Sequence, residues 1–185
     1  GNFTGNTSLK NEELIAYELG YRGQLTDHLE LNVEAFVNQH SDMIATVGAP
    51  PTTYANTHKL TSYGLETSLD WRIKTWWHLC ASHSFEYMEE EDKINDFETG
   101  RLGISSMPRH KLSLMNRFNL DSKTTLNTQI FWSDEFLGQF PDDNEIPSHV
   151  RVDVHLARTF LDDQVEVAIG GTNLTDPRHY EGSQL

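Results

Sequence analysis

The sequence lacks any long apolar run. Its 185 residues have a mean hydropathy of -0.55, and no stretch approaches the roughly 20 apolar residues that a membrane-spanning helix needs. A helical membrane protein is therefore excluded. A membrane-spanning sheet is not excluded, because its strands are apolar on one side only and leave a weak trace in averaged hydropathy.

Cysteine and positive charge are also scarce. Cys80 is the single cysteine, so neither an internal disulfide nor a CxxC-type metal site can form within the chain. The nine histidines are scattered and include no HExxH, and we predict neither a metal site nor a cofactor. The formal net charge of -14 argues against a nucleic-acid partner, because phosphate binding relies on clustered Lys and Arg.

The sequence contains no recognisable catalytic motif. Ser, His and Asp are plentiful, but there is no GxSxG, and no spacing marks a nucleophile with its base. An outer-membrane hydrolase is therefore the weakest of the interpretations considered, and we expect the chain not to be an enzyme.

What the sequence does contain is strict alternation. In YELGYRGQLTDHLELNVEAF (Tyr17 to Phe36), apolar and polar residues alternate on both sides of a short polar turn. Successive side chains of a strand point to opposite faces, so a period of two predicts a hairpin with two unlike faces. The same test predicts eight strands in all, at residues 15–22, 29–37, 62–73, 77–87, 111–120, 126–132, 150–160 and 165–170.

Charged residues fall on one parity of these strands, and the other parity carries only Arg158. Arg158 lies near a turn, from which a long side chain can reach a membrane interface. An Arg or Lys at mid-membrane on a lipid-facing position would cost roughly 2 to 4 kcal/mol. The distribution of charge therefore fits a sheet with one face against lipid and one against water.

Connection lengths alternate as well. The tight turns are expected at Leu25 to His28, Lys74 to Thr75, Asp121 to Lys123 and Leu161 to Gln164, and the long polar loops at Asn38 to His58, Met88 to Arg109 and Ser133 to His149. Aromatic residues gather near both strand ends, with an aliphatic middle. Two aromatic bands are favoured by the two interfaces of a bilayer. The predicted fold class is all-β, an antiparallel up-and-down transmembrane β-barrel segment with short periplasmic turns and long extracellular loops.

Two alternatives remain open at this stage. The eight strands could close into a complete small outer-membrane barrel, or into a soluble lipocalin-like binding protein whose apolar parity forms a core. Both require the eighth strand to pair with the first.

Four motifs in the right order resemble the barrel of TonB-dependent outer-membrane receptors. They are LKNEELIAYELGYRGQLTDHLELNVEAFVNQHSDMI, YANTHKLTSYGLETSLDWRI, MPRHKLSL, and VRVDVHLARTF followed by VEVAIGGTNLTDPRHYEG. The resemblance implies that residues 1–185 form the C-terminal part of a 22-stranded barrel in the bacterial outer membrane. Such receptors import a scarce nutrient, such as a siderophore, haem or cobalamin, using energy relayed by TonB.

The chain departs from the family pattern in two ways, because it shows neither the plug domain with its TonB box nor the closing strand. We therefore expect a segment of a larger receptor, with outer-membrane lipid, a small nutrient ligand and, through the plug, the TonB system as partners. The resemblance places ligand contacts in the extracellular loops, the upper barrel wall and the plug, so the candidates are the long loops and the inward residues near them, such as His40, Tyr54, Arg109 and His110. Lower inward charges are expected in wall ion pairs and plug contacts, namely Glu18, Arg22, Glu66, Asp70, Arg72 and Arg151.

Overall fold

The computed structural model describes residues 3–48, 50–90, 107–137 and 145–175, and it is built of strands joined by turns and loops. The strands are β1 (Phe3–Thr4), β2 (Glu13–Thr26), β3 (Leu29–Val47), β4 (Thr52–Lys74), β5 (Trp77–Glu90), β6 (His110–Asn119), β7 (Thr124–Ser133), β8 (Phe136–Leu137), β9 (Glu145–Ile146), β10 (His149–Phe160) and β11 (Val165–Gly171). All eight predicted strands are present. The part of the chain that the structure describes holds no helix long and apolar enough to cross a membrane.

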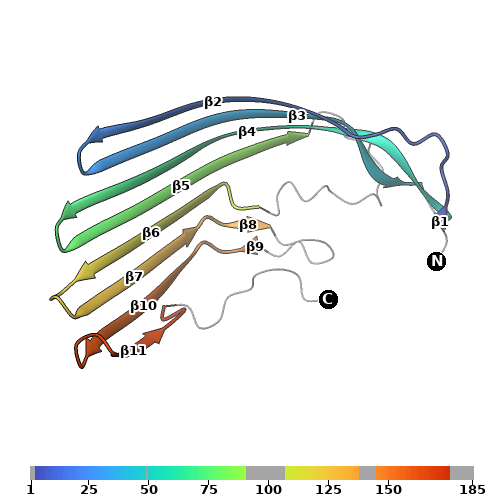
Figure 1. Cartoon of the computed structure of the whole chain (residues 1–185). Coiled ribbons are helices and arrows are strands. Elements are labelled where there is room, and N and C mark those ends of the chain that lie inside the picture. The colour runs from blue at the N-terminus through green and yellow to red at the C-terminus, as the bar shows by residue number, and fades with distance from the viewer. Residues whose placement is uncertain (1–2, 49, 91–106, 138–144, 176–185) are drawn as a thin grey trace.

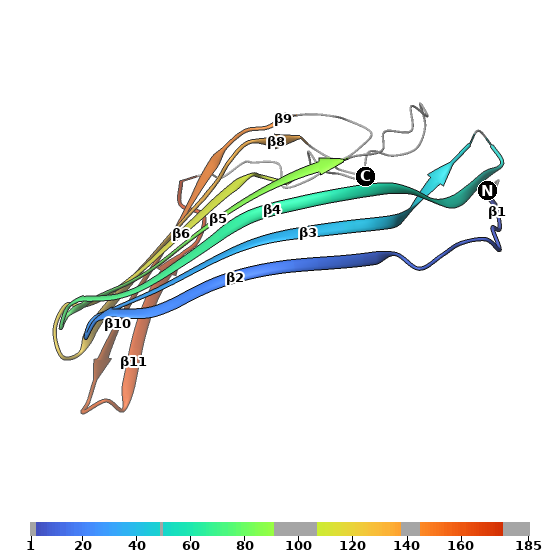
Figure 2. The same cartoon turned by 90° about the horizontal axis from the view of Figure 1, so that it is seen from above.

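The strands form one curved antiparallel sheet, in the order β11-β10-β7-β6-β5-β4-β3-β2 (Figures 1 and 2). β1 pairs in parallel with β4, and β8 and β9 form a separate small ribbon. Among the described residues, β2 and β11 stand at opposite edges of the sheet and do not pair. The eighth predicted strand therefore does not close onto the first, and the two small-barrel alternatives are wrong.

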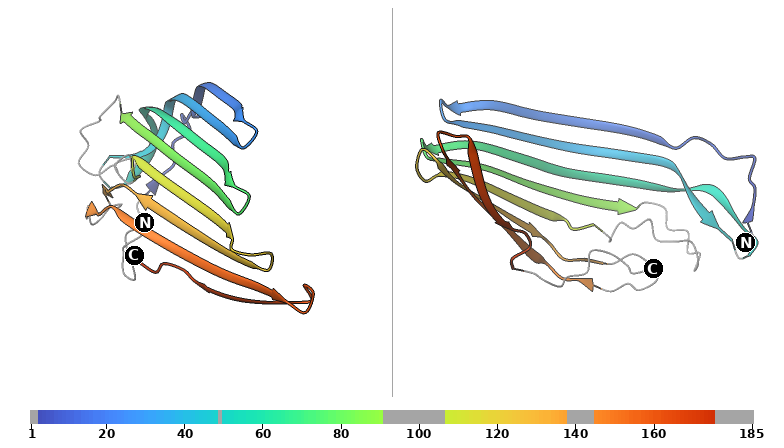
Figure 3. Two further views of the ribbon diagram at one scale, coloured as in Figure 1. Left: turned by 90° about the vertical axis from the view of Figure 1, so that its left-hand side faces the viewer. Right: turned by 60° about the horizontal axis from the view of Figure 1, so that its bottom comes forward.

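The short turns all lie at one end of the sheet, as predicted (Figure 3). They connect β2 to β3 at Asp27, β4 to β5 at Thr75, β6 to β7 at Asp121 and β10 to β11 at Asp162. Leu161, Asp162 and Asp163 all have positive φ angles, and a chain reversal of this kind suits Asp better than most residues. Neighbouring strands are thus held in register from the turn end.

The predicted long loop between Asn38 and His58 is wrong. β3 runs on to Val47 and β4 begins at Thr52, so most of this segment is a long hairpin that reaches beyond the rest of the sheet (Figure 1). The register shifts between His40 and Ile44, where Asp42 has a φ of 54°. A bulge reverses the alternation of faces for the residues that follow it. The test for a period of two therefore did not detect the strand beyond this point. Of the other two predicted loops, Met88 to Arg109 falls largely outside the described residues, whereas the described ends of Ser133 to His149 pair as the short β8–β9 ribbon.

The sheet has almost no protein core. Within the described residues the buried apolar side chains are Ala45, Leu60, Ile146 and Ala157, whereas many large apolar side chains are exposed. Leu19 is 79% exposed and Ile169 is 73% exposed. A soluble protein rarely leaves so much contiguous apolar surface uncovered. The apolar parity therefore lines an outer surface, as expected of a sheet whose apolar face meets lipid.

Arg158, the one charged residue of the apolar parity, is held at the turn end. Its guanidinium Nη1 donates to Asp121 Oδ2 at 3.2 Å and to Thr124 Oγ1 at 2.7 Å. Its Cζ lies 5.7 Å from the centre of the Phe160 ring. The side chain thus reaches the turn and finds a carboxylate there, which confirms the explanation given for this exception.

Asp121 gives this turn a pH dependence. Its pKa is held below the ordinary value of 3.8, first by the hydrogen bond from the Lys123 amide and then by the Thr124 hydroxyl. A carboxyl with a lowered folded-state pKa contributes stability above its ordinary pKa and loses it as the pH falls through the folded value. We therefore expect Asp121→Asn to lower the thermal midpoint at neutral pH but to equal the wild type in strong acid. Thermal melting of both proteins in detergent, from neutral pH to strong acid, measures the two midpoints. A difference between the midpoints that stays constant with pH would contradict the prediction.

Candidate functional site

The polar parity forms one continuous face of the sheet. Pairing from strand to strand places one residue each from β2, β3, β4, β5, β6, β7 and β10 side by side, which gives the row Gly20, Glu34, Glu66, Ser84, Lys111, Ser133 and His149. A hollow of about 610 Å³ lies against this row and is lined by most of its members, together with smaller polar residues such as Asn32 and Ser113. This hollowed face is the candidate functional surface, and we call it the inner wall.

The opposite face, which we call the outer face, is sorted by height. Its middle row is Gly23, Leu31, Leu69, Ala81, Leu114, Ile130 and Val152. Below it Trp76, Trp77 and Phe118 stack near the turns, with ring centres 5.7 to 6.3 Å apart. Above it Tyr63 and Tyr87 pack at 5.3 Å. From Trp77 to Tyr87 the strand rises about 33 Å, which at a tilt of about 45° spans roughly 24 Å, the height of a membrane barrel's apolar band.

Ion pairs lie on the inner wall. Arg22 Nε donates to Glu30 Oε1 at 2.9 Å, and Arg151 Nη2 lies 3.3 Å from Asp153 Oδ2. Arg151 also lies over the Phe131 ring, 4.2 Å from its centre. Arg72 contacts the turn instead, where its Nη2 donates to the Asp27 carbonyl at 3.3 Å. Wall ion pairs are therefore present at Arg22 and at Arg151, but Arg151 lies near the start of β10, at the long-loop end of the sheet, so its expected place in the lower wall was wrong. The expected plug contacts are not tested.

Two of the predicted ligand residues lie on the long β3–β4 hairpin. His40 is half-buried on β3, opposite Leu14 and Leu60, just before the bulge. Tyr54 lies nearer the tip, is 45% exposed, and stacks on Phe3 with ring centres 5.7 Å apart. They occupy the long-loop end of the sheet, as expected. The structure does not test whether either contacts a ligand.

The other two predicted ligand residues contact the outer face, so the inward orientation expected of His110 was wrong, and neither residue's ligand contact is tested. His110 pairs with Phe85, packs 4.8 Å from its ring centre, and has Nδ1 3.1 Å from Nε2 of His83. The guanidinium of Arg109 lies 5.0 Å from the centre of the Tyr87 ring. His110 has the same parity as Leu112 and Leu114, which the sequence already showed. A histidine within an apolar row was mistaken for an inward polar residue.

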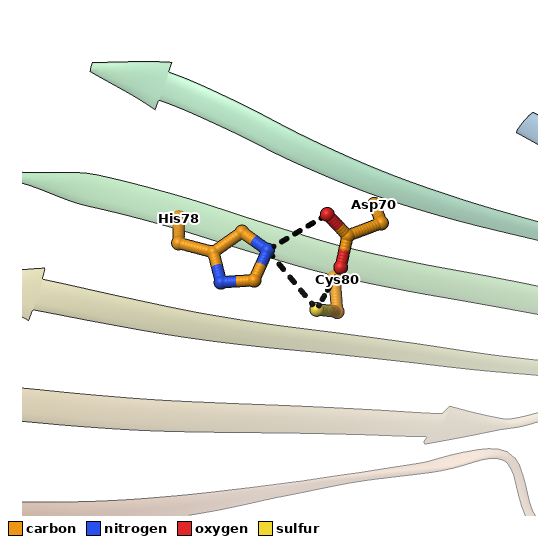
Figure 4. A group of neighbouring side chains, drawn as sticks. All are labelled: Asp70, His78 and Cys80. Atoms are coloured by element: carbon orange, nitrogen blue, oxygen red, sulfur yellow. Dashed lines mark hydrogen bonds and ion pairs between the residues drawn. The ribbon is translucent and has the colours of Figure 1, made fainter. Parts of the chain in front are cut away.

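A cluster that the sequence motifs did not predict lies on the inner wall of the β4–β5 hairpin. Asp70, His78 and Cys80 each direct a polar atom at the other two (Figure 4). The spacing of these three residues along the sequence matches no known metal-site motif. Strand pairing could have revealed the cluster, because Asp70 and Cys80 are equally distant from the turn at Thr75 and therefore lie opposite each other.

An open, curved, antiparallel sheet with an apolar outer face between aromatic bands and a charged, hollowed inner wall defines a section of transmembrane barrel. Comparison with known proteins then gives the family. Residues 1–174 match the model of the TonB dependent receptor-like β-barrel, and the chain belongs to that family. The family is one of outer-membrane receptors rather than enzymes, as expected from the sequence.

Solved structures agree in fold. The ferric-catecholate import receptor Fiu from E. coli K12 matches with a TM-score of 0.77 at 14% identity, over 96% of this chain and 25% of that one. The ferric yersiniabactin uptake receptor FyuA from Yersinia pestis matches with a TM-score of 0.74 at 18% identity, over 94% of this chain and 26% of that one. The copper transporter OprC matches with a TM-score of 0.70 at 13% identity, over 95% of this chain and 28% of that one. The chain thus spans about a quarter of each receptor. No curated protein matches the sequence.

Proposed function

We propose that residues 1–185 are the C-terminal barrel segment of a TonB-dependent receptor that imports a small, scarce nutrient across the outer membrane. The mechanism is binding at the extracellular mouth followed by gated passage, with no covalent chemistry. The observation that carries the proposal is the family match over residues 1–174 on a sheet sorted into an apolar outer face and a polar inner wall. The relatives named above, for ferric chelates and copper, favour a metal-bearing cargo such as a siderophore complex.

The partners follow from the two faces. The outer face would contact outer-membrane lipid, and the inner wall would enclose a plug domain encoded before this segment, which carries the contact with TonB. The Arg22–Glu30 and Arg151–Asp153 pairs neutralise charge along the wall where such a plug would pack. We expect the cargo to bind at the long-loop end, with Tyr54 and His40 among its contacts. Arg109 and His110 we assign instead to the outer-leaflet side of the rim.

The proposal is tested by deleting the receptor gene and measuring uptake of labelled ferric siderophores, haem and cobalamin. We expect loss of one cargo, restored by the intact gene and abolished when a protonophore collapses the energy supply of TonB. Unchanged uptake of every cargo in the deletion strain would count against nutrient import. Uptake that persists with the protonophore would count against coupling to TonB.

Ligand contact at the mouth gives a sharper prediction. Tyr54→Ala is expected to raise the Kd for the cargo about tenfold, because buried aromatic contacts at binding sites are commonly worth more than 1 kcal/mol. Tyr63→Ala is the matched control, since Tyr63 is 40% exposed and also stacks on an aromatic partner, but on the outer face. Cargo binding to whole cells, corrected for surface expression, measures both. Equal losses in the two variants would remove Tyr54 from the binding site.

A further inference from the structure

Three side chains with metal-ligating atoms meet on the inner wall, three to five residues from the tight turn at Thr75. His78 Nε2 lies 2.9 Å from Asp70 Oδ1 and 3.7 Å from Cys80 Sγ, and Cys80 Sγ lies 3.4 Å from Asp70 Oδ2 (Figure 4). One imidazole nitrogen thus faces both a carboxylate and a thiol. We propose that Asp70, His78 and Cys80 bind a thiophilic transition-metal ion of the Zn²⁺ class.

The distances fit such an ion. Bonds of about 2.0 to 2.3 Å from a tetrahedral Zn²⁺ to nitrogen, oxygen and sulfur place each pair of ligand atoms roughly 3.4 to 3.6 Å apart. The two distances to sulfur, 3.4 Å from Asp70 Oδ2 and 3.7 Å from His78 Nε2, already have this size. One ligand atom from each residue lies within 4.8 Å of the other two, and the Asp70 and His78 side chains end in rotatable bonds on an exposed surface, so that one carboxylate oxygen can turn toward the ion.

The scaffold holds the three residues in place. Asp70 and Cys80 are direct partners on β4 and β5, and His78 lies two residues before Cys80, on the same face. Both strands are hydrogen-bonded on their other sides as well, to β3 and β6, so the hairpin is not at an edge of the described sheet. A tight turn at Thr75 fixes the register. The ligand atoms are therefore gathered before any ion arrives.

The donor set selects the class of ion. Ca²⁺ and Mg²⁺ take oxygen ligands, whereas thiolate and imidazole favour Zn²⁺ and its neighbours. A thiolate and a carboxylate together balance a divalent charge. Three protein ligands leave a fourth position open, which is typical of sites whose ion exchanges or binds a further molecule. Cys80 and His78 line a second hollow of the inner wall, also of about 610 Å³. Water or cargo in this hollow can reach the open fourth position of the ion.

A thioether sulfur also lies near the cluster. Met115 on β6 pairs with Cys80, lines the same hollow and is 46% exposed. A thioether is a soft ligand, and it would add affinity for Cu(I) more than for Zn²⁺. Met115→Leu is therefore expected to weaken competition by Cu(I) while leaving Zn²⁺ binding unchanged.

The test uses the full-length receptor in detergent, without a histidine tag and with its thiol kept reduced. Co²⁺ serves as a coloured substitute for Zn²⁺. We expect one Co²⁺ per receptor at this site, with a thiolate-to-cobalt charge-transfer band that Zn²⁺ displaces and Mg²⁺ does not. Cys80→Ser should abolish the band. His78→Gln and Asp70→Asn should each weaken binding by about 100-fold, since even residues that only support metal ligands are worth about 10- to 100-fold.

His155→Gln is the matched control. His155 lies on the inner wall on β10, in the same row of paired residues as His78, and is absent from the cluster. Its replacement should leave the band and the affinity unchanged. Sheet content by circular dichroism and heat-dependent gel migration show that each variant is folded. Absence of the band in the folded wild type, or a band that survives Cys80→Ser, would overturn the proposal. Neither result depends on which nutrient the receptor imports.

Discussion

Leu114→Arg is expected to destabilise the barrel by about 2 to 4 kcal/mol, whereas Ser113→Arg, one residue earlier, is expected to change its stability little. Leu114 lies in the middle row of the outer face, between Ala81 and Ile130. An arginine there would place its charge at mid-bilayer, far from either interface. Ser113 points to the inner wall and lines the large hollow, where an arginine has both room and water.

The measurement is urea unfolding of the full-length receptor in lipid vesicles, followed by tryptophan fluorescence. The two variants add the same side chain to the same strand, so the change in net charge is the same in both. A larger loss for Ser113→Arg than for Leu114→Arg would mean that the lipid-facing and water-facing assignments of the two faces are reversed. Equal losses would mean that the two faces do not meet different environments.

The sequence predicted the sheet well because strand geometry is local. A period of two needs only neighbouring residues, and all eight segments that show it are strands in the structure. Arg158 could be explained in advance for the same reason, since its distance from the turn is visible in the chain. Which carboxylate it would meet depended on pairing, and Asp121 emerged only when β6, β7 and β10 were placed together.

Failures arose where information was not local. The bulge near Asp42 hid the upper half of the β3–β4 hairpin, because one inserted residue reverses the parity and resembles a loop. His110 was assigned to the wrong face because residue type was given more weight than parity. The Asp70, His78 and Cys80 cluster needed register, which a one-dimensional motif search does not use. A search that pairs residues equally distant from each predicted turn would have found it.

The pairing also predicts a steric requirement at Gly64. Gly64 lies on β4, between Phe36 of β3 and Glu86 of β5, and a Cβ atom there would meet the Phe36 ring and the Phe85 carbonyl oxygen. The aromatic ring thus covers the glycine, and the strands approach closely. Gly20, on the same face, offers a matched control because an added Cβ would find only the Val33 carbonyl, at 3.9 Å.

Gly64→Ala is expected to destabilise the barrel by about 1 to 3 kcal/mol through overpacking. Gly20→Ala should be neutral or stabilising by up to about 1 kcal/mol, because alanine restricts the unfolded chain more than glycine does. Urea unfolding in vesicles measures both. Combining Phe36→Leu with Gly64→Ala should recover part of the loss, and the double-mutant cycle then separates the clash with the ring from the clash with the Phe85 backbone. Equal effects of alanine at positions 20 and 64 would show that Phe36 does not pack on Gly64 in the folded barrel.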